Sequence, residues 1–83
     1  MRIGISDTKA LREHLERALN DTPGLPATDI GSIGVLIRAG EWVIALEALC
    51  TQIAEYEIVI SDEQKARIDH LGRLLEVRTD DLL

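Results

Sequence analysis

The sequence contains little that would let a protein fold by anything other than aliphatic packing. It has one cysteine, one tryptophan, one tyrosine and no phenylalanine among its 83 residues. A lone cysteine, Cys50, cannot form an internal disulfide and has no second thiol for a metal or redox motif. Aromatic residues make up only 2%, so Leu, Ile, Val and Ala have to build the core, and this composition favours helices over sheets.

Positive charge is also scarce. Nine basic residues stand against fifteen acidic ones, which gives a net charge of -6. A protein that binds DNA or RNA directly needs an excess of positive charge, so we expect a basic protein as partner and no direct contact with nucleic acid. The 46% of hydrophobic and 29% of charged residues are typical of a folded chain rather than a disordered one.

Long apolar runs are absent as well. The longest unbroken run covers residues 42–46, far below the roughly 18 residues that a membrane span requires. The first residues reach the polar Ser6 and Asp7 without the apolar stretch of a secretory signal. We therefore expect a cytoplasmic protein with no membrane partner, folded as one domain over residues 1–83.

Helical periodicity predicts an all-α fold. The ranges with this period are 7–20, 28–40, 41–56 and 62–75. Short links between them favour an antiparallel bundle of about four helices, with the second and third joined as a hairpin at Gly40. The residues expected to face inward on the first, second and fourth helices are Leu11, Leu15, Ala18, Leu19, Ile30, Ile33, Leu36, Ile37, Ile68, Leu71, Leu74 and Leu75.

The third helix is expected at the centre of the bundle, because its apolar residues cover nearly half of its circumference. These residues are Trp42, Val43, Ala45, Leu46, Leu49, Cys50, Ile53, Ala54 and Tyr56. We interpret Cys50 as a small core hydrophobe and Trp42 as a core residue.

Polar residues predict where the helices begin. Ser6 is placed to cap the first helix, and Thr28 or Asp29 to cap the second. Residues 61–64 match a capping box, in which the Ser61 hydroxyl accepts from the Gln64 backbone and the Gln64 side chain returns to Ser61. The β-branched residues 58–60 are interpreted as an extended connector that plugs the core, with pairing to residues 3–5 as a minor alternative.

Converging groups of the kind that catalysis requires are not evident. We interpret His14 and His70 as ordinary histidines at the edge of an apolar face, because neither has a second histidine or a carboxylate at a ligand spacing. The glycines at positions 31, 34 and 40 do not form a nucleotide-binding pattern. We expect neither an enzyme nor a bound cofactor or metal.

Acidic residues supply the candidate binding surface, since no basic residue lies between Arg38 and Lys65. Such a stretch is either a solvated face that keeps the protein soluble or an electrostatic docking surface for a basic partner. The candidate partner-binding residues are Glu41, Glu47, Glu55, Tyr56, Glu57, Asp62 and Glu63.

The central block carries a resemblance to a known family. It comprises Gly40-Glu41-Trp42, Ala45-Leu46-Glu47 and Leu49-Cys50, followed by Gln52, Glu55-Tyr56, Ile58 and Ile60-Ser61. Residues 29–77 resemble the MafI-type immunity proteins of bacterial polymorphic toxin systems, which are small acidic helical proteins encoded beside a secreted toxin.

The resemblance implies a protein without catalysis of its own that binds and blocks the C-terminal domain of the neighbouring toxin, often a nuclease. It directs attention to Glu41, Glu47, Glu55 and Tyr56, either as toxin contacts or as residues that organise the fold; Glu47, for example, could anchor a neighbouring helix. The alternative function is a small helical interaction or homo-oligomerisation module.

Overall fold

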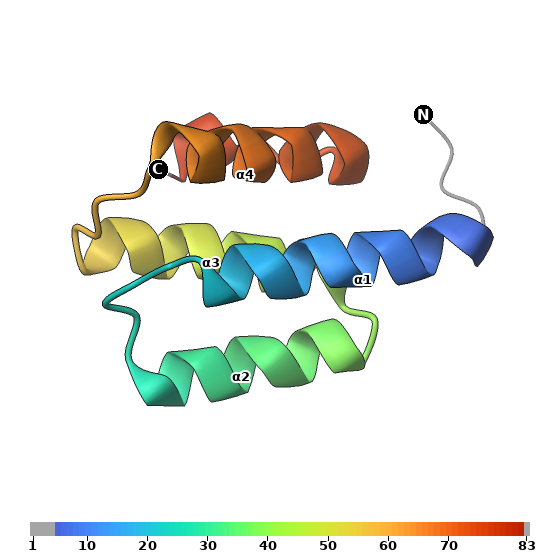
Figure 1. Cartoon of the computed structure of the whole chain (residues 1–83), viewed down its shortest axis with the longest axis horizontal. Coiled ribbons are helices and arrows are strands. Elements are labelled where there is room, and N and C mark those ends of the chain that lie inside the picture. The colour runs from blue at the N-terminus through green and yellow to red at the C-terminus, as the bar shows by residue number, and fades with distance from the viewer. Residues whose placement is uncertain (1–4, 83) are drawn as a thin grey trace.

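Four antiparallel helices make up most of residues 5–82, the part of the chain that the computed structural model describes. They are α1 (Ile5–Asn20), α2 (Ala27–Arg38), α3 (Trp42–Glu55) and α4 (Asp62–Leu75), followed by one short 3-10 turn, η1 (Thr79–Asp81). Successive helices run in opposite directions (Figure 1). The predicted all-α bundle is confirmed.

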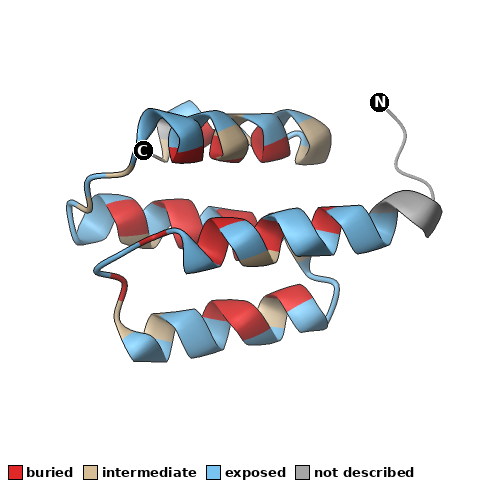
Figure 2. Ribbon diagram, in the orientation of Figure 1, coloured by how far each residue is buried: buried red, intermediate tan, exposed pale blue. Residues whose placement is uncertain are grey.

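The bundle has α1 and α3 at its centre, with α4 on one side and α2 on the other (Figure 1). Both central helices contact every other helix. The buried faces point inward between them (Figure 2). As predicted, the core is aliphatic and includes Cys50; its residues are Leu11, Leu15, Ala18, Leu19, Leu25, Ile33, Ile37, Ala45, Leu46, Leu49, Cys50, Ile53, Ile68 and Leu71.

Several residues expected in the core are only partly covered. Ile30 is exposed, although Ile33 and Ile37 on the same helix are buried as predicted. Because α2 lies at one side of the bundle and packs mainly on α1 and α3, only a narrow stripe of it is covered. Residues that are half-buried instead of buried are Leu36, Trp42, Leu74 and Leu75.

Two predicted helix caps are wrong. Helix α1 begins at Ile5, so Ser6 lies inside the helix and not in front of it. Helix α2 begins at Ala27 with Pro26 as the preceding residue, and no side chain caps it. Thr28 and Asp29 are therefore within the first turn. Pro26 has the non-helical ψ of 148° typical of a residue in front of a helix, and its carbonyl accepts the first helical hydrogen bond from Ile30 N–H at 3.0 Å.

The capping box at the start of α4 is half confirmed. The Ser61 hydroxyl accepts from the Gln64 backbone N–H at 3.0 Å, as predicted. The Gln64 side chain does not return to Ser61. Its Nε2 donates to the carbonyl of Ala18 at 2.6 Å and to the hydroxyl of Thr22 at 3.1 Å, and its Oε1 accepts from Arg67 at 2.9 Å. Gln64 is thus a buried link between the end of α1 and the start of α4.

The segment between α3 and α4 is a connector without regular secondary structure, and the structure describes no strand within residues 5–82. Ile58 and Ile60 are half-buried and pack against the core, as predicted for a plug. Val59 between them is 89% exposed. The alternative pairing with residues 3–5 falls largely outside the described residues.

Left-handed residues end α3 and α4. Glu57 has φ 51° and Glu76 has φ 58°, whereas α2 is followed by Gly40 at φ 79°. After α3, Glu57 N–H donates to Ala54 and Ile58 N–H donates to Ile53, the two bonds of a Schellman motif. Glycine is the usual residue at this position, and a glutamate there costs roughly 1 kcal/mol.

The chain after α4 folds back over Gly72. The Thr79 hydroxyl donates to Asp69 at 3.0 Å, and Val77 N–H donates to the Gly72 carbonyl at 2.8 Å. A Cβ at position 72 would lie 2.8 Å from the carbonyl oxygen of Val77 and 2.8 Å from Thr79 Cγ2. Gly72 therefore allows this close approach, which explains a glycine inside a helix.

Replacing Gln64 with Leu is expected to lower the free energy of unfolding by about 1 to 3 kcal/mol, because buried polar partners on α1 and α4 lose hydrogen bonds. Urea denaturation measures the change. Gln52→Leu is the control; it removes one partly buried bond to Asp29 and should cost less than about 1 kcal/mol. Equal losses would show that the Gln64 network contributes no more than a surface contact.

Replacing Gly72 with Ala is expected to destabilise the protein by about 1 kcal/mol or more, because the clash with Val77 outweighs the better helix propensity of alanine. The matched control is Gly31→Ala, since a Cβ there meets no heavy atom within 4 Å. That variant should gain about 0.5 to 1 kcal/mol. If thermal unfolding shows that Gly72→Ala is also stabilised, the tail does not pack closely over Gly72 in solution.

Candidate functional site

The acidic surface consists of the seven predicted residues, Glu41, Glu47, Glu55, Tyr56, Glu57, Asp62 and Glu63, and all seven are exposed. Glu41 immediately precedes α3, and Glu47 and Glu55 lie on this helix. Asp62 and Glu63 occupy the first turn of α4, where the helix dipole favours negative charge.

The structure brings five of these residues to one end of the bundle. There α3 ends, the connector passes, and α4 begins (Figure 1); the five are Glu55, Tyr56, Glu57, Asp62 and Glu63. Glu41 lies at the other end of α3, roughly 21 Å from Glu55 along the helix axis at about 1.5 Å per residue. The acidic surface is thus elongated rather than compact.

Most of these carboxylates have no cationic partner among the described residues. Glu63 approaches Arg67 at 3.6 Å, and this is the one ion pair that the described residues provide for the acidic surface. Glu47 makes no hydrogen bond to another helix within residues 5–82, so the alternative of an anchoring role for it finds no support. The negative charges of the remaining carboxylates are left uncompensated within the described chain.

Tyr56 is fixed in place by a residue that sequence reasoning had assigned to a helix cap. Asp29, at the start of α2, accepts from the Tyr56 hydroxyl at 3.1 Å and from Gln52 Nε2 at 3.1 Å. The hydrogen bond to Asp29, and then its negative charge, raise the pKa of Tyr56 above its ordinary value of 10.0. Asp29 is half-buried and borders the acidic surface, while Tyr56 remains 47% exposed.

The cysteine and the histidines form no reactive centre. Burial, and secondarily the charge of Asp69, raise the pKa of the Cys50 thiol to about 11, so the thiol stays protonated at neutral pH. His14 and His70 are exposed. Within residues 5–82, no group of His, Cys, Asp and Glu side chains is arranged to hold a metal ion.

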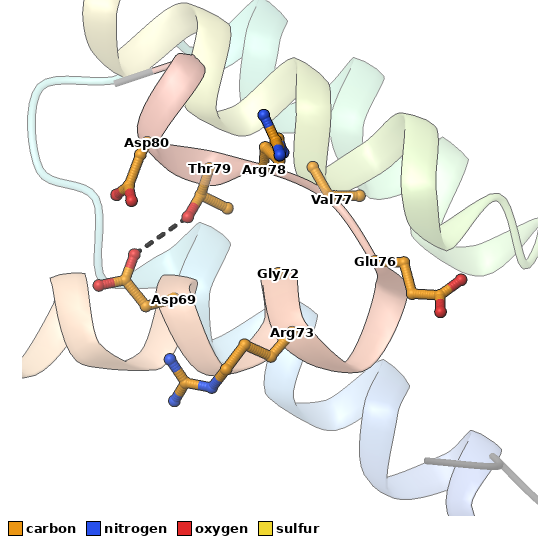
Figure 3. A pocket seen from close by; sticks show the side chains of 8 residues that line it. All are labelled: Asp69, Gly72, Arg73, Glu76, Val77, Arg78, Thr79 and Asp80. Atoms are coloured by element: carbon orange, nitrogen blue, oxygen red, sulfur yellow. Dashed lines mark hydrogen bonds between the residues drawn. The ribbon is translucent and has the colours of Figure 1, made fainter.

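Two shallow hollows are lined entirely by residues that the structure describes. The first, of about 490 Å³, lies between α4 and the tail, where Thr79 bonds to Asp69 and Glu76 points away (Figure 3). Its charged lining mixes both signs: Asp69, Arg73, Glu76, Arg78 and Asp80. The second, of about 480 Å³, lies where α3 meets α4 and is lined by Ile53, Ala54, Glu57, Ile58, Ile60 and Lys65. The second hollow borders the acidic surface.

Comparison with known proteins gives no relative. No protein-family model matches the chain, and neither a curated protein nor a solved structure does. In the described part of the chain, no helix combines the length and apolar character that a membrane span requires. The resemblance of residues 29–77 to MafI-type immunity proteins stays a prediction. A proposal about function therefore has to be based on the chemistry of the surface.

Replacing Asp29 with Asn is expected to lower the pKa of Tyr56 toward 10.0, since the variant removes the charge that favours the protonated phenol. The chain has one tyrosine, so ultraviolet absorbance against pH measures this pKa directly. A raised pKa in the folded state adds stability below pH 10.0 that is lost as the pH rises past the folded pKa.

Glu55→Gln is the control for this titration and should shift the pKa less, because Glu55 is the weakest of the contributing groups. An Asp29→Asn variant that titrates like the wild type would show that the hydrogen bond between Tyr56 and Asp29 does not form in solution.

Proposed function

We propose that this chain is an immunity protein that binds the C-terminal domain of a cognate bacterial toxin and blocks it. The observation that carries the proposal is the elongated acidic surface, whose carboxylates are exposed and, except for Glu63, have no ion-pair partner among the described residues. Repulsion among uncompensated charges destabilises the folded state of a small protein. A basic partner neutralises these charges, and the loss of repulsion contributes to the affinity of the complex.

The mechanism of inhibition follows from charge. A nuclease holds its substrate in a basic groove that recognises phosphates. Carboxylates presented along α3 and at the start of α4 occupy such a groove in place of the phosphates, and they also speed the encounter by electrostatic attraction. The protein needs no catalytic group for this task, and it acts in the cytoplasm of the producing cell.

Tyr56 supports the proposal as a pre-ordered contact residue. Tyrosine is enriched among residues that dominate binding energy. The hydrogen bond to Asp29 holds the ring in one orientation while nearly half of the side chain stays exposed. Ordering the side chain before association reduces the entropy that binding would otherwise cost.

A homo-oligomerisation module is the second candidate. The apolar face of α3 that suggested it is largely buried in the core of this chain. Two neighbouring side chains on α3 remain outside, since Val43 is 42% and Ile44 50% exposed. Glu41 and Glu47 flank this pair, so two copies would bring like charges together. Sedimentation of the isolated protein as a stable dimer would favour this second candidate.

Coexpression with the toxin domain encoded by the neighbouring reading frame tests the proposal. We expect a complex that copurifies and rescue of growth. The double variant Glu47→Gln, Glu55→Gln should raise the Kd about tenfold, chiefly through slower association, and reduce its salt dependence. Glu13→Gln, at an exposed position of α1, is the control and should bind like the wild type. The absence of both complex and rescue would contradict the proposal.

A further inference from the structure

The connector between α3 and α4 contributes apolar residues to a surface hollow and also carries an exposed apolar residue. Ile58 and Ile60 line the hollow of about 480 Å³ together with Ile53 and Ala54 of α3. Val59 lies between Ile58 and Ile60 in the chain but is not part of the lining; it is 89% exposed, the largest exposure among the large exposed hydrophobic residues. We name this feature the corner: the hollow and residues 57–60. An exposed apolar patch with a polar rim is typical of a binding site.

Charge around the corner is predominantly negative. Glu57 lines the hollow itself, Glu55 precedes it on α3, and Asp62 and Glu63 follow it on α4. Lys65 is the one basic residue in the lining, and it is paired with Asp69 at 3.3 Å and Asp80 at 3.8 Å. The net field at the mouth of the hollow therefore favours a cation.

Glu57 occupies its position at a cost to the fold. It takes the left-handed conformation that glycine adopts more easily, at φ 51°. Its carboxylate makes no hydrogen bond or ion pair with the residues that the structure describes. Glu76 after α4 shares this conformation and is equally unpartnered among the described residues. What distinguishes Glu57 is its place in the lining of the hollow, beside Ile58 and Ile60.

We propose that the corner is the centre of the toxin interface and receives one arginine or lysine side chain of the toxin domain. The aliphatic stem of such a side chain packs against Ile58 and Ile60 in the hollow, while its charged head meets the carboxylate of Glu57. Neighbouring apolar atoms of the toxin domain cover the exposed Val59. This inference rests on the proposed function and specifies which part of the acidic surface dominates binding.

Charge complementarity selects a basic protein over the other occupants of an apolar hollow. A second copy of this chain would bring the same four carboxylates against each other, and the whole chain carries a net charge of -6. Nucleic acids and anionic membranes are repelled for the same reason. A wholly apolar segment would bury the rim carboxylates without a partner, which is unfavourable.

Binding of the full chain to the C-terminal domain of the adjacent toxin, measured by calorimetry, tests the inference with two matched pairs. Val59→Ser should raise the Kd about tenfold, whereas Val35→Ser, at a valine that is 56% exposed on α2, should leave it unchanged. Glu57→Gly should raise the Kd about tenfold, whereas Glu76→Gly, at the corresponding position after α4, should not.

Thermal unfolding separates lost binding from lost folding. Both glutamate-to-glycine variants should melt at a higher temperature than the wild type, because glycine adopts the left-handed conformation without strain. A Glu57→Gly variant that is more stable and yet binds more weakly supports the inference. Glu57→Gln, which keeps the side-chain shape, should show a similar loss of binding and a weaker dependence on salt.

The two proposals fail in different ways. If the wild type does not bind the toxin domain, the proposed function is wrong and this inference falls with it. If the wild type binds, but Val59→Ser and Glu57→Gly bind as tightly as their controls, the corner is not the centre of the interface while the proposed function stands.

Discussion

One buried side-chain amide, that of Gln64, connects the first helix of the bundle to the last. Aliphatic packing holds helices together without specifying how far one is shifted along another, whereas a hydrogen-bonded network accepts one arrangement. Here the amide reaches Ala18 and Thr22 on one side and Arg67 on the other. Among the described residues, no buried side-chain nitrogen or oxygen is left without a partner. This network positions the start of α4, and with it the part of the acidic surface near the corner.

Helical periodicity was sufficient to predict the architecture, because each helix buries a stripe that recurs every three or four residues. The central position of α3 followed from the width of its apolar face, and five of its nine apolar residues are fully buried. Periodicity does not reveal how much of a stripe a neighbour covers, so Ile30 was placed in the core wrongly. Nor does local pattern reveal a distant partner: the Gln64 side chain bonds to α1, 46 residues away, instead of to Ser61.

The candidate site was predictable in its charge and not in its detail. Exposure of the six acidic residues was expected from their charge, whereas Tyr56 was predicted on the apolar face of the third helix and is 47% exposed. Asp29 was missed as a site residue because its partners lie 23 and 27 residues further along the chain.

Val59 was read as part of a plug because a β-branched run suggests burial at every position, whereas an extended connector turns alternate side chains outward. A glycine in α4 was explained only by the tail that packs over it.

The up-and-down order of the helices has a consequence for the route by which the chain folds. Helices that are adjacent in the sequence are also adjacent in space, and such local contacts form rapidly. The pairings of α1 with α3 and with α4 join helices that are not neighbours in the sequence. The pairing with α4 closes the longer loop and carries the larger entropic cost. Docking of α4 is therefore the last step that we expect, and it completes the corner by adding Lys65 to the lining. A chain that has folded its first three helices would have most of its core, but its corner would lack the side that α4 supplies through Lys65.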